Sequence, residues 1–157
     1  SASLAKHFPI AFNLIPQIDV FQDNLYTKEE MKMVNETHKI LHDYDMGITA
    51  TTVRVPVYRS HSESVNVEFE KDLELDDLRK AIDAFPGIHM MDDPQNQVYP
   101  MPLYTSGDND CYVGRLRRDF SQPNTFNFWV VGDQIRKGAA LNTLQIAETM
   151  IKNGWIK

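Results

Sequence analysis

Apolar and polar residues alternate on both sides of a short polar stretch at 59–64. A period of two sends successive side chains to opposite faces of a strand, so residues 48–58 and 65–70 are each predicted to be a strand. The two strands would be joined by a bend within the polar stretch. The alternating residues are Thr52, Val53, Arg54, Val55 and Val57 before the bend, and Val65, Asn66, Val67, Glu68, Phe69 and Glu70 after it.

This bend is the first candidate site. Arg54 shares its face with polar residues, and His61 is expected at the bend itself. A histidine can act as a general acid or base near neutral pH, and an arginine can hold a carboxylate through two parallel hydrogen bonds. A surface hairpin with solvated side chains is the alternative for an isolated arginine and histidine.

The rest of the chain predicts a mixture of helices and strands. Thr27 followed by Glu30 is a capping box, which predicts a helix from there to about His42. Before it, Pro9 and Pro16 interrupt an apolar run, which is expected to be an extended arm with a short strand. The other predicted elements are a helix at 72–85, a short strand at 88–91, a loop at 92–104, strands at 109–119 and 125–131, and a helix at 137–153 that Gly154 ends.

This order predicts an α+β fold, in which helices cover one face of a mixed, mainly antiparallel sheet. In the strand at 109–119, strict alternation would place Gly114, Leu116 and Arg118 opposite Arg115 and Arg117. The three arginines are expected on a charged sheet face or at a subunit contact.

Composition excludes several classes of function. The net charge of the 157 residues is -6, which argues against nucleic-acid binding because phosphate recognition needs a basic surface. No apolar run is long enough for a membrane helix and no signal peptide opens the chain, so no membrane partner is expected. The one cysteine, Cys111, fits a reducing, cytoplasmic compartment, and the carboxylates of Asp108 and Asp110 make it a poor nucleophile. No metal site is predicted.

Five separated blocks of the sequence form a recognisable set. They are PIAFNLIPQIDVF, EEMKMVNETHKIL, RVPVYRSHSESVNVEFEK, VGRLRRD and FWVVGDQIRKGAALNTLQIAE. In this order they resemble blocks of aspartate-β-semialdehyde dehydrogenase. The central block contains that family's histidine pattern, Arg-x-Pro-Val-x-x-x-His-Ser-Glu, at residues 54–63.

The resemblance covers the C-terminal half of that family only. Neither the family's glycine-rich nucleotide motif nor its Asn-Cys-Ser/Thr nucleophile occurs in the sequence. Residues 1–157 are therefore expected to be a single dimerisation and substrate-binding domain with a glyceraldehyde-3-phosphate-dehydrogenase-like fold, without the N-terminal nucleotide-binding domain. Residues 1–5 have no counterpart and are expected to be a tag remnant or a disordered start.

The resemblance also implies roles for five residues. His61 would be the catalytic acid and base, Arg54 would bind the substrate α-carboxylate, and Glu36 its amino group. Lys39 would bind phosphate, and Gln134 would lie beside the nicotinamide of NADP. Without the resemblance, Glu36 and Lys39 would be a solvated pair three residues apart on a helix, and the segment of Gln134 a capped helix that packs on its sheet.

The implied reaction is the NADPH-dependent reduction of β-aspartyl phosphate to aspartate β-semialdehyde and phosphate, on the route to lysine, threonine and methionine. The isolated chain would be inactive, and two copies would form a homodimer, or a tetramer, through the uncovered sheet face. Two alternatives stay open: the related N-acetyl-glutamyl-phosphate reductase, and a stand-alone dimerisation or binding module without catalysis. The choice between NADP and NAD is also open.

Overall fold

The computed structural model describes residues 8–156. The predicted tag remnant or disordered start at 1–5 lies outside these residues. The described residues divide into two compact units, one that ends at Val57 and one that begins at Tyr58.

The first unit is built around helix α1, Lys28–Leu41. The predicted capping box is confirmed: Thr27 Oγ1 accepts from the Glu30 N–H, and Glu30 Oε2 accepts from the Thr27 N–H at 2.8 Å. The other carboxylate oxygen of Glu30 accepts from the Thr52 N–H at 2.8 Å. The helix ends at His42, whose backbone is left-handed at φ 53°. One buried carboxylate thus joins the start of α1 to the segment that precedes the candidate site.

The predicted strand at 48–58 is wrong. This segment is extended, but only Arg54 pairs, through two backbone hydrogen bonds of 2.8 and 3.1 Å with Ile15 of the arm. Pro16 directly follows Ile15, and Pro56 lies two residues after Arg54. Neither proline has the backbone N–H that a longer ladder of hydrogen bonds would need. The short strand expected in the arm is likewise reduced to isolated bridges.

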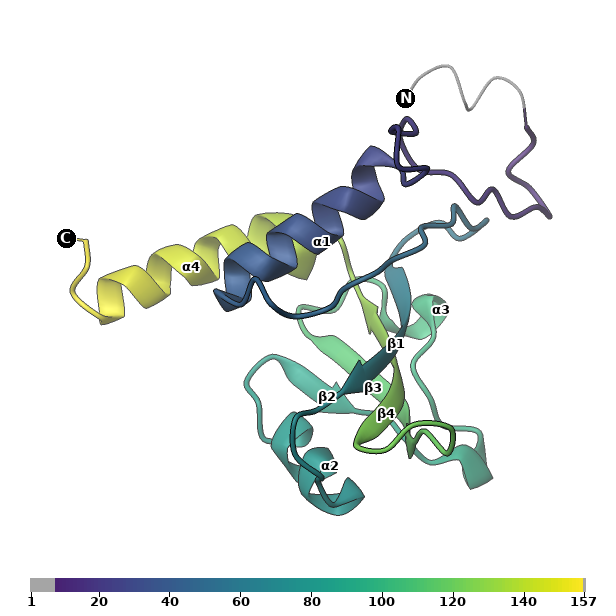
Figure 1. Ribbon diagram of the computed structural model, residues 1–157. Helices are drawn as coiled ribbons and strands as arrows, with labels where there is room; N and C mark the ends of the chain where they lie inside the picture. The colour runs from purple at the N-terminus through teal and green to yellow at the C-terminus, as the bar shows by residue number, and fades with distance from the viewer. Residues whose placement is uncertain (1–7, 157) are drawn as a thin grey trace. The chain divides into compact units, whose positions relative to one another are not determined.

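The second unit contains a four-stranded sheet in the order β1-β4-β3-β2 (Figure 1). Strands β1 and β3 pair antiparallel with β4, and β2 pairs parallel with β3, which confirms the predicted mixed, mainly antiparallel sheet. The strands are β1 His61–Glu68, β2 Ile88–Met90, β3 Cys111–Arg118 and β4 Thr125–Gly132.

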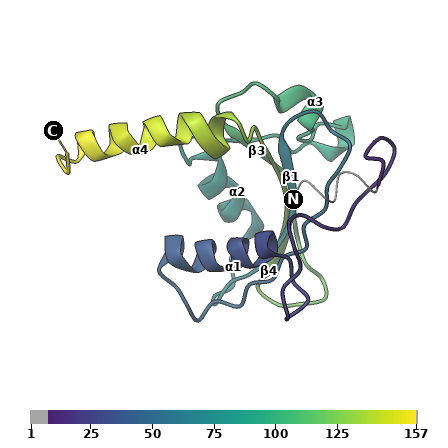
Figure 2. The same ribbon diagram turned by 90° about the horizontal axis from the view of Figure 1, so that it is seen from above.

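Strand β4 lies inside the sheet, as predicted, and carries the fully buried Phe126 and Val131. Helix α2, Leu75–Asp83, is shorter than predicted and packs against β2 and β3. Figure 2 shows α2 to one side of the strands. The predicted loop at 92–104 contains a 3-10 turn, η2 Pro94–Asn96, and leads into a one-turn helix, α3 Pro102–Thr105, which packs against β4.

A β-bulge interrupts β3 between Gly114 and Arg117. Gly114 pairs with Trp129 and Arg117 pairs with Asn127, so Gly114 and Arg117 share one face of the sheet. The predicted alternation, which put Arg117 opposite Gly114, is therefore wrong beyond Gly114. The reason is local: Arg115 is left-handed, with φ 58°, which adds one residue to this strand.

The segment that follows β2 crosses β3 at Gly114. A Cβ atom at this position would lie 2.3 Å from the Met91 carbonyl oxygen and 2.6 Å from Pro100 Cδ. Only a glycine allows this approach of one backbone segment to another.

The C-terminal helix has two parts. A π-helical turn, η3 Arg136–Ala140, leads into α4, Leu141–Lys152, where one regular helix was predicted. Gly154, at φ 71°, ends it as predicted. Apolar side chains of α4, among them Leu144 and Ile151, are exposed. None of the helices between residues 8 and 156 is both long and apolar enough to cross a membrane.

Candidate functional site

His61 is the first residue of β1 and pairs with Gly132, the last residue of β4. The prediction that it lies in the bend is therefore wrong by one residue: the turn ends at Ser60, which has φ 78°. The His61 side chain is exposed, and within residues 8–156 its ring makes no hydrogen bond. The imidazole is thus presented at one end of the sheet, with both ring nitrogens free to meet a ligand.

The turn before His61 is held by side chains from two other segments. The Ser60 N–H donates to Gln134 Oε1 at 2.7 Å, and the Ser60 hydroxyl lies 2.9 Å from that of Ser106. Ser60 is 4% exposed, so these bonds are shielded from water.

Asp133 is the buried centre of this end of the sheet. Its Oδ2 accepts from the Gly107 N–H at 2.7 Å and lies 2.7 Å from Nε of Arg59, an ion pair whose N–H does not point squarely at the oxygen. Its Oδ1 accepts from the N–H groups of Ile135 and Arg136, at 2.9 and 3.2 Å. Asp133 therefore joins three segments: the turn before His61, the loop after α3 and the start of η3.

The ionisation of Asp133 follows from these contacts. Burial by itself would raise the pKa of this carboxyl, but the N–H groups of Gly107, Ile135 and Arg136, together with the Arg59 side chain, hold the pKa below its ordinary value. A fully buried carboxylate is stable here because each oxygen is hydrogen-bonded.

Cys111 begins β3, beside Gly132: a Cβ atom on that glycine would lie 3.0 Å from the Cys111 sulfur. Burial is the main cause that raises the pKa of the thiol, Lys137 opposes it, and Glu63 and Asp110 add to it. A raised pKa leaves little thiolate at neutral pH. This agrees with the prediction that Cys111 is a poor nucleophile, although burial matters more than the neighbouring carboxylates.

The other three predicted site residues belong to the first unit. Glu36 and Lys39 are exposed on α1, and no ion pair joins them within the described residues. Arg54 is also exposed, and its pairing with Ile15 uses only backbone atoms. The structure thus brings His61 and Gln134 together at one end of the sheet, while Glu36, Lys39 and Arg54 present free side chains in their own unit.

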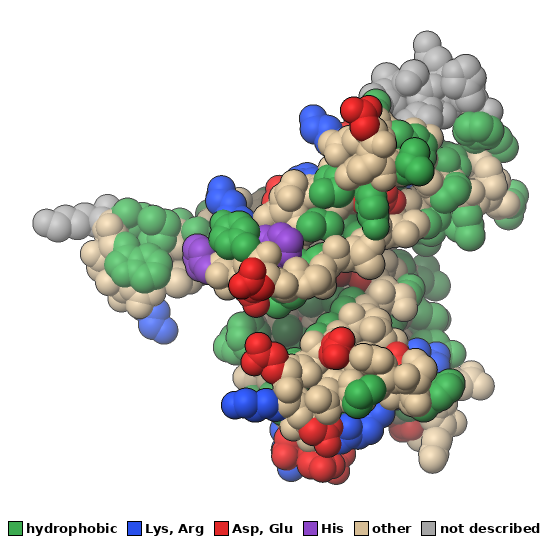
Figure 3. Space-filling view, viewed as in Figure 1, with side chains coloured by type: hydrophobic (Ala, Val, Ile, Leu, Met, Phe, Trp, Pro, Cys, Tyr) green, Lys and Arg blue, Asp and Glu red, His purple; other side chains and the backbone are tan. Residues whose placement is uncertain are grey.

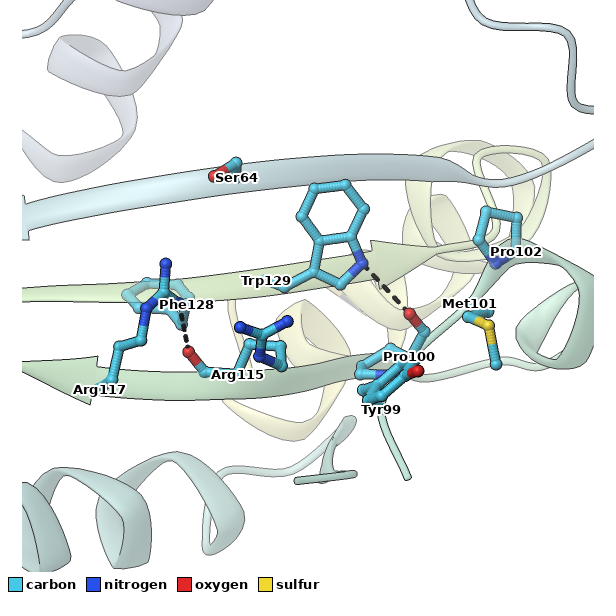
Figure 4. A pocket seen from close by; sticks show the side chains of 9 residues that line it. All are labelled: Ser64, Tyr99, Pro100, Met101, Pro102, Arg115, Arg117, Phe128 and Trp129. Carbon is cyan, nitrogen blue, oxygen red and sulfur yellow. Dashed lines mark hydrogen bonds between the residues drawn. The ribbon is translucent and has the colours of Figure 1, made fainter. Parts of the chain in front are cut away.

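A second feature of the sheet is a hollow of about 400 Å³, here called the Trp129 hollow (Figure 4). The Trp129 indole N–H donates to the Pro100 carbonyl at 3.2 Å, and Arg117 donates to the Arg115 carbonyl at 2.7 Å. None of the five predicted site residues lines it. The lining residues are Ser64, Tyr99, Pro100, Met101, Pro102, Arg115, Arg117, Phe128 and Trp129.

Comparison with known proteins assigns the chain to a family. The family model described as "Semialdehyde dehydrogenase, dimerisation domain" matches residues 3–137. The chain belongs to the semialdehyde dehydrogenase dimerisation-domain family.

Curated relatives of this semialdehyde dehydrogenase domain match almost all of it. An aspartate-semialdehyde dehydrogenase of Bacillus subtilis is 51% identical over 148 residues, which are 94% of this chain and 43% of the relative. An aspartate-semialdehyde dehydrogenase of Campylobacter jejuni is 50% identical over 145 residues, which are 92% of this chain and 42% of the relative. The chain therefore spans less than half the length of the relatives that it matches.

Solved structures agree with this assignment of the dehydrogenase domain. The aspartate semialdehyde dehydrogenase II of Vibrio cholerae, complexed with ASA, has a TM-score of 0.88 and is 42% identical over 93% of this chain and 43% of its own. A probable aspartate-semialdehyde dehydrogenase of Pseudomonas aeruginosa has a TM-score of 0.84 at 30% identity, again over 93% and 43%. The C-terminal-half fold implied by the resemblance is confirmed.

In this dehydrogenase domain, reasoning from sequence missed Asp133 as a structural centre, together with its partners Arg59 and Gly107. One signal was available, because an aspartate just before a predicted helix is a common N-cap and accepts from the first free N–H groups. Asp133 does so with Ile135 and Arg136. The contacts with Arg59 and Gly107 link distant positions and have no local signal.

Proposed function

We propose that this chain is the dimerisation and substrate-binding domain of an NADPH-dependent aspartate-β-semialdehyde dehydrogenase. The enzyme would reduce β-aspartyl phosphate to aspartate β-semialdehyde and phosphate, in the biosynthesis of lysine, threonine and methionine. The observation that carries the proposal is the placement of His61: within a domain of this family, its side chain is exposed and makes no hydrogen bond within residues 8–156, at the start of β1. The relatives named above, all aspartate-semialdehyde dehydrogenases, support the proposal.

In this proposal a cysteine outside these 157 residues attacks the acyl phosphate, and phosphate leaves behind a thioester. Reduction of this thioester, with the hydride that bound NADPH would supply, gives a thiohemiacetal. His61 then moves the proton of the thiohemiacetal oxygen, as base in one direction and as acid in the other. An exposed imidazole without a competing partner suits this role, because both ring nitrogens are free to exchange a proton.

The substrate carries charges of both signs, so its site needs both signs as well. Arg54 would bind the α-carboxylate, Glu36 the amino group, and Lys39 the phosphate. All three side chains are exposed, and none has an ion-pair partner within residues 8–156, so no internal contact must break before they bind substrate.

Gln134 would contact the nicotinamide of NADP through the NH₂ group of its side chain. Its carboxamide oxygen is used by Ser60, which leaves the NH₂ group without an acceptor in the described residues. A free NH₂ group can donate to the carbonyl oxygen of a nicotinamide. When bound, NADPH would supply the hydride, while most of its binding would depend on residues outside this chain.

Two copies would pair through the open face of the sheet as a homodimer, and two dimers would form a tetramer. The name of the matching family supports a dimerisation role, and Arg115 and Arg117 lie beside apolar residues in the Trp129 hollow, as at many subunit contacts. A cytoplasmic location stays a prediction. The curated relatives do not favour the alternatives, the N-acetyl-glutamyl-phosphate reductase and the stand-alone module.

The direct test compares this chain with a polypeptide that adds the missing N-terminal half. The longer protein should form NADPH from aspartate semialdehyde, phosphate and NADP, whereas the 157-residue chain should not, because it lacks the nucleophile and the phosphate-binding loop. Turnover by the short chain would overturn the division of roles proposed here. A longer protein that uses only N-acetyl-glutamate semialdehyde would favour the related reductase.

A further inference from the structure

The turn before His61 is strained and therefore needs support. Ser60 has φ 78°, a left-handed conformation that is unfavourable for a residue with a side chain. The strand pairing of His61 with Gly132 starts only after this residue. The direction in which the His61 side chain leaves the sheet thus depends on what holds Ser60.

Two adjacent residues hold the turn. Gln134 Oε1 accepts from the Ser60 N–H, and the preceding residue, Asp133, lies at 2.7 Å from Arg59, the residue before Ser60. Both directly follow Gly132, the partner of His61 in the sheet. The strand pairing of His61 with Gly132 and the side-chain contacts of Asp133 and Gln134 with the turn therefore form a closed ring of interactions around the start of β1.

Asp133 makes the ring rigid. It is fully buried and also accepts three backbone N–H groups, so it cannot shift without leaving several of them unpaired in the interior. The hydrogen bonds of Asp133 also fix the backbone position of the next residue, Gln134. The Gln134 carboxamide therefore meets the Ser60 N–H in a defined geometry.

We propose that Gln134 is a positioning residue for His61: its carboxamide oxygen fixes the Ser60 turn that orients the imidazole, and the buried Asp133, paired with the partly exposed Arg59, supports that turn. The proposal rests on the proposed function only for the catalytic role of His61. It gives the two ends of one side chain different tasks, since the oxygen holds the turn and the NH₂ group stays free for a ligand.

The first experiment needs no activity. Amide hydrogen exchange at Ser60 is measured by NMR in the 157-residue chain and in three variants. Gln134→Met removes the acceptor and should speed exchange at Ser60 at least tenfold, while Gln134→Glu keeps an acceptor oxygen and should retain most of the protection. The matched control is Gln145→Met, which removes a carboxamide that accepts from Lys137 and should leave Ser60 unchanged. Equal exchange in all four proteins would overturn the proposal.

The second experiment uses the longer enzyme. Gln134→Met should lower kcat by about ten- to a hundredfold, and kcat of Gln134→Glu should be at least about tenfold higher than that of Gln134→Met. KM for NADPH should rise in both variants, because both lack the NH₂ group. Equal loss of kcat in the two variants would mean that Gln134 acts only on the cofactor, which would overturn the proposal.

The two experiments also separate this inference from the proposed function. If His61→Asn leaves the longer enzyme fully active, the proposed role of His61 is wrong, and the exchange measurement still decides whether Gln134 holds the turn. If His61→Asn inactivates the enzyme but neither Gln134 variant alters Ser60 exchange, only the positioning role fails.

Discussion

Asp92 Oδ1 accepts a 2.7 Å hydrogen bond from the backbone N–H of Arg115, the residue at which β3 bulges. Its other oxygen accepts from the Leu116 N–H at 3.3 Å and lies 2.8 Å from a guanidinium nitrogen of Arg79 on α2. The Asp92 side chain is 2% exposed. One buried carboxylate thus stabilises the bulge and attaches α2 to it.

Replacing Asp92 with alanine should therefore destabilise the second unit strongly. Two backbone N–H groups would lose their partner, which costs about 1–3 kcal/mol for each one left buried, and the partly exposed Arg79 would lose its ion pair. Urea unfolding of the chain would measure the loss. The control is Asp77→Ala, at a 72% exposed carboxylate paired with Lys80, which should change the free energy of unfolding by about 0.5 kcal/mol or less. A similar effect of the two changes would contradict this account of the bulge.

Asp119 should make stability depend on pH. Hydrogen bonds from Ser121, first its hydroxyl and then its N–H, and from Asn127 and Asn66 lower the pKa of Asp119 from 3.8 to about 2. Because the folded state has the lower pKa, the stabilisation is fully present above pH 3.8 and is lost as the pH falls toward 2. Asp119→Asn should thus be less stable than wild type at pH 6, and the two should converge near pH 2.

Chemical unfolding at several pH values would test this convergence. The matched control is Asp23→Asn, at an exposed carboxylate that makes no hydrogen bond within residues 8–156, and it should stay close to wild type throughout. A constant difference between Asp119→Asn and wild type from pH 6 to pH 2 would show that the lowered pKa is not the cause.

In the longer enzyme, His61→Asn should lower kcat by about 10²- to 10⁴-fold, because asparagine keeps polarity and approximate size but transfers no proton. The control is His89→Asn, which removes another exposed histidine, paired with Asp110 at 2.8 Å and outside the candidate site. Steady-state kinetics would distinguish the two. A change in KM alone for His61→Asn would mean that His61 binds substrate without transferring a proton.

Arg54→Lys should lower kcat/KM in the longer enzyme by about ten- to a hundredfold, since an ammonium cannot reproduce both parallel hydrogen bonds of a guanidinium to a carboxylate. The fold should not change, because Arg54 pairs with Ile15 through backbone atoms only. A substrate analogue without the α-carboxylate provides the control and should be nearly insensitive to the change. Equal losses with both substrates would assign Arg54 to the scaffold.

Self-association of the chain is the fifth prediction. Large apolar side chains are exposed on the arm, and Figure 3 shows such side chains at the surface there and at the C-terminal end of α4. Sedimentation should detect dimers at about 10 µM, a range suited to moderate affinities. Arg117→Glu, in the Trp129 hollow, should weaken the dimer, whereas Lys80→Glu, at a 77% exposed side chain of α2, should not. A monomer at this concentration would contradict pairing through the sheet.

Local signals in the sequence predicted the elements that depend on local contacts. Thr27 and Glu30 are three residues apart and satisfy each other, so their capping box could be recognised without the rest of the fold. The glycine that ends α4, Gly154, and the apolar run of β4 could likewise be recognised from a short stretch of sequence. The polar bend identified His61 as a candidate site residue, and the family resemblance implied its catalytic role. In the structure the His61 ring is exposed and makes no hydrogen bond within residues 8–156.

Contacts between distant positions account for the errors. Alternation at 48–58 indicated a strand, but a strand also needs a partner over several residues, and the arm supplies one only at Ile15. Alternation in β3 failed because Arg115 bulges, and the carboxylate that holds it, Asp92, is 23 residues away in the sequence. Asp133 is similar, since its contact with Arg59 depends on the pairing of β1 with β4.

The absence of a side chain at Gly114 has a consequence for the Trp129 hollow. The segment that comes within 2.3 Å of a Cβ position on Gly114 continues into Tyr99–Pro102, which form one wall of the hollow. Any larger residue at 114 would push this wall away from the sheet and would pull the Pro100 carbonyl from the Trp129 indole. The size of the hollow, and of any surface that fits into it, is therefore set by a missing methyl group on the neighbouring strand.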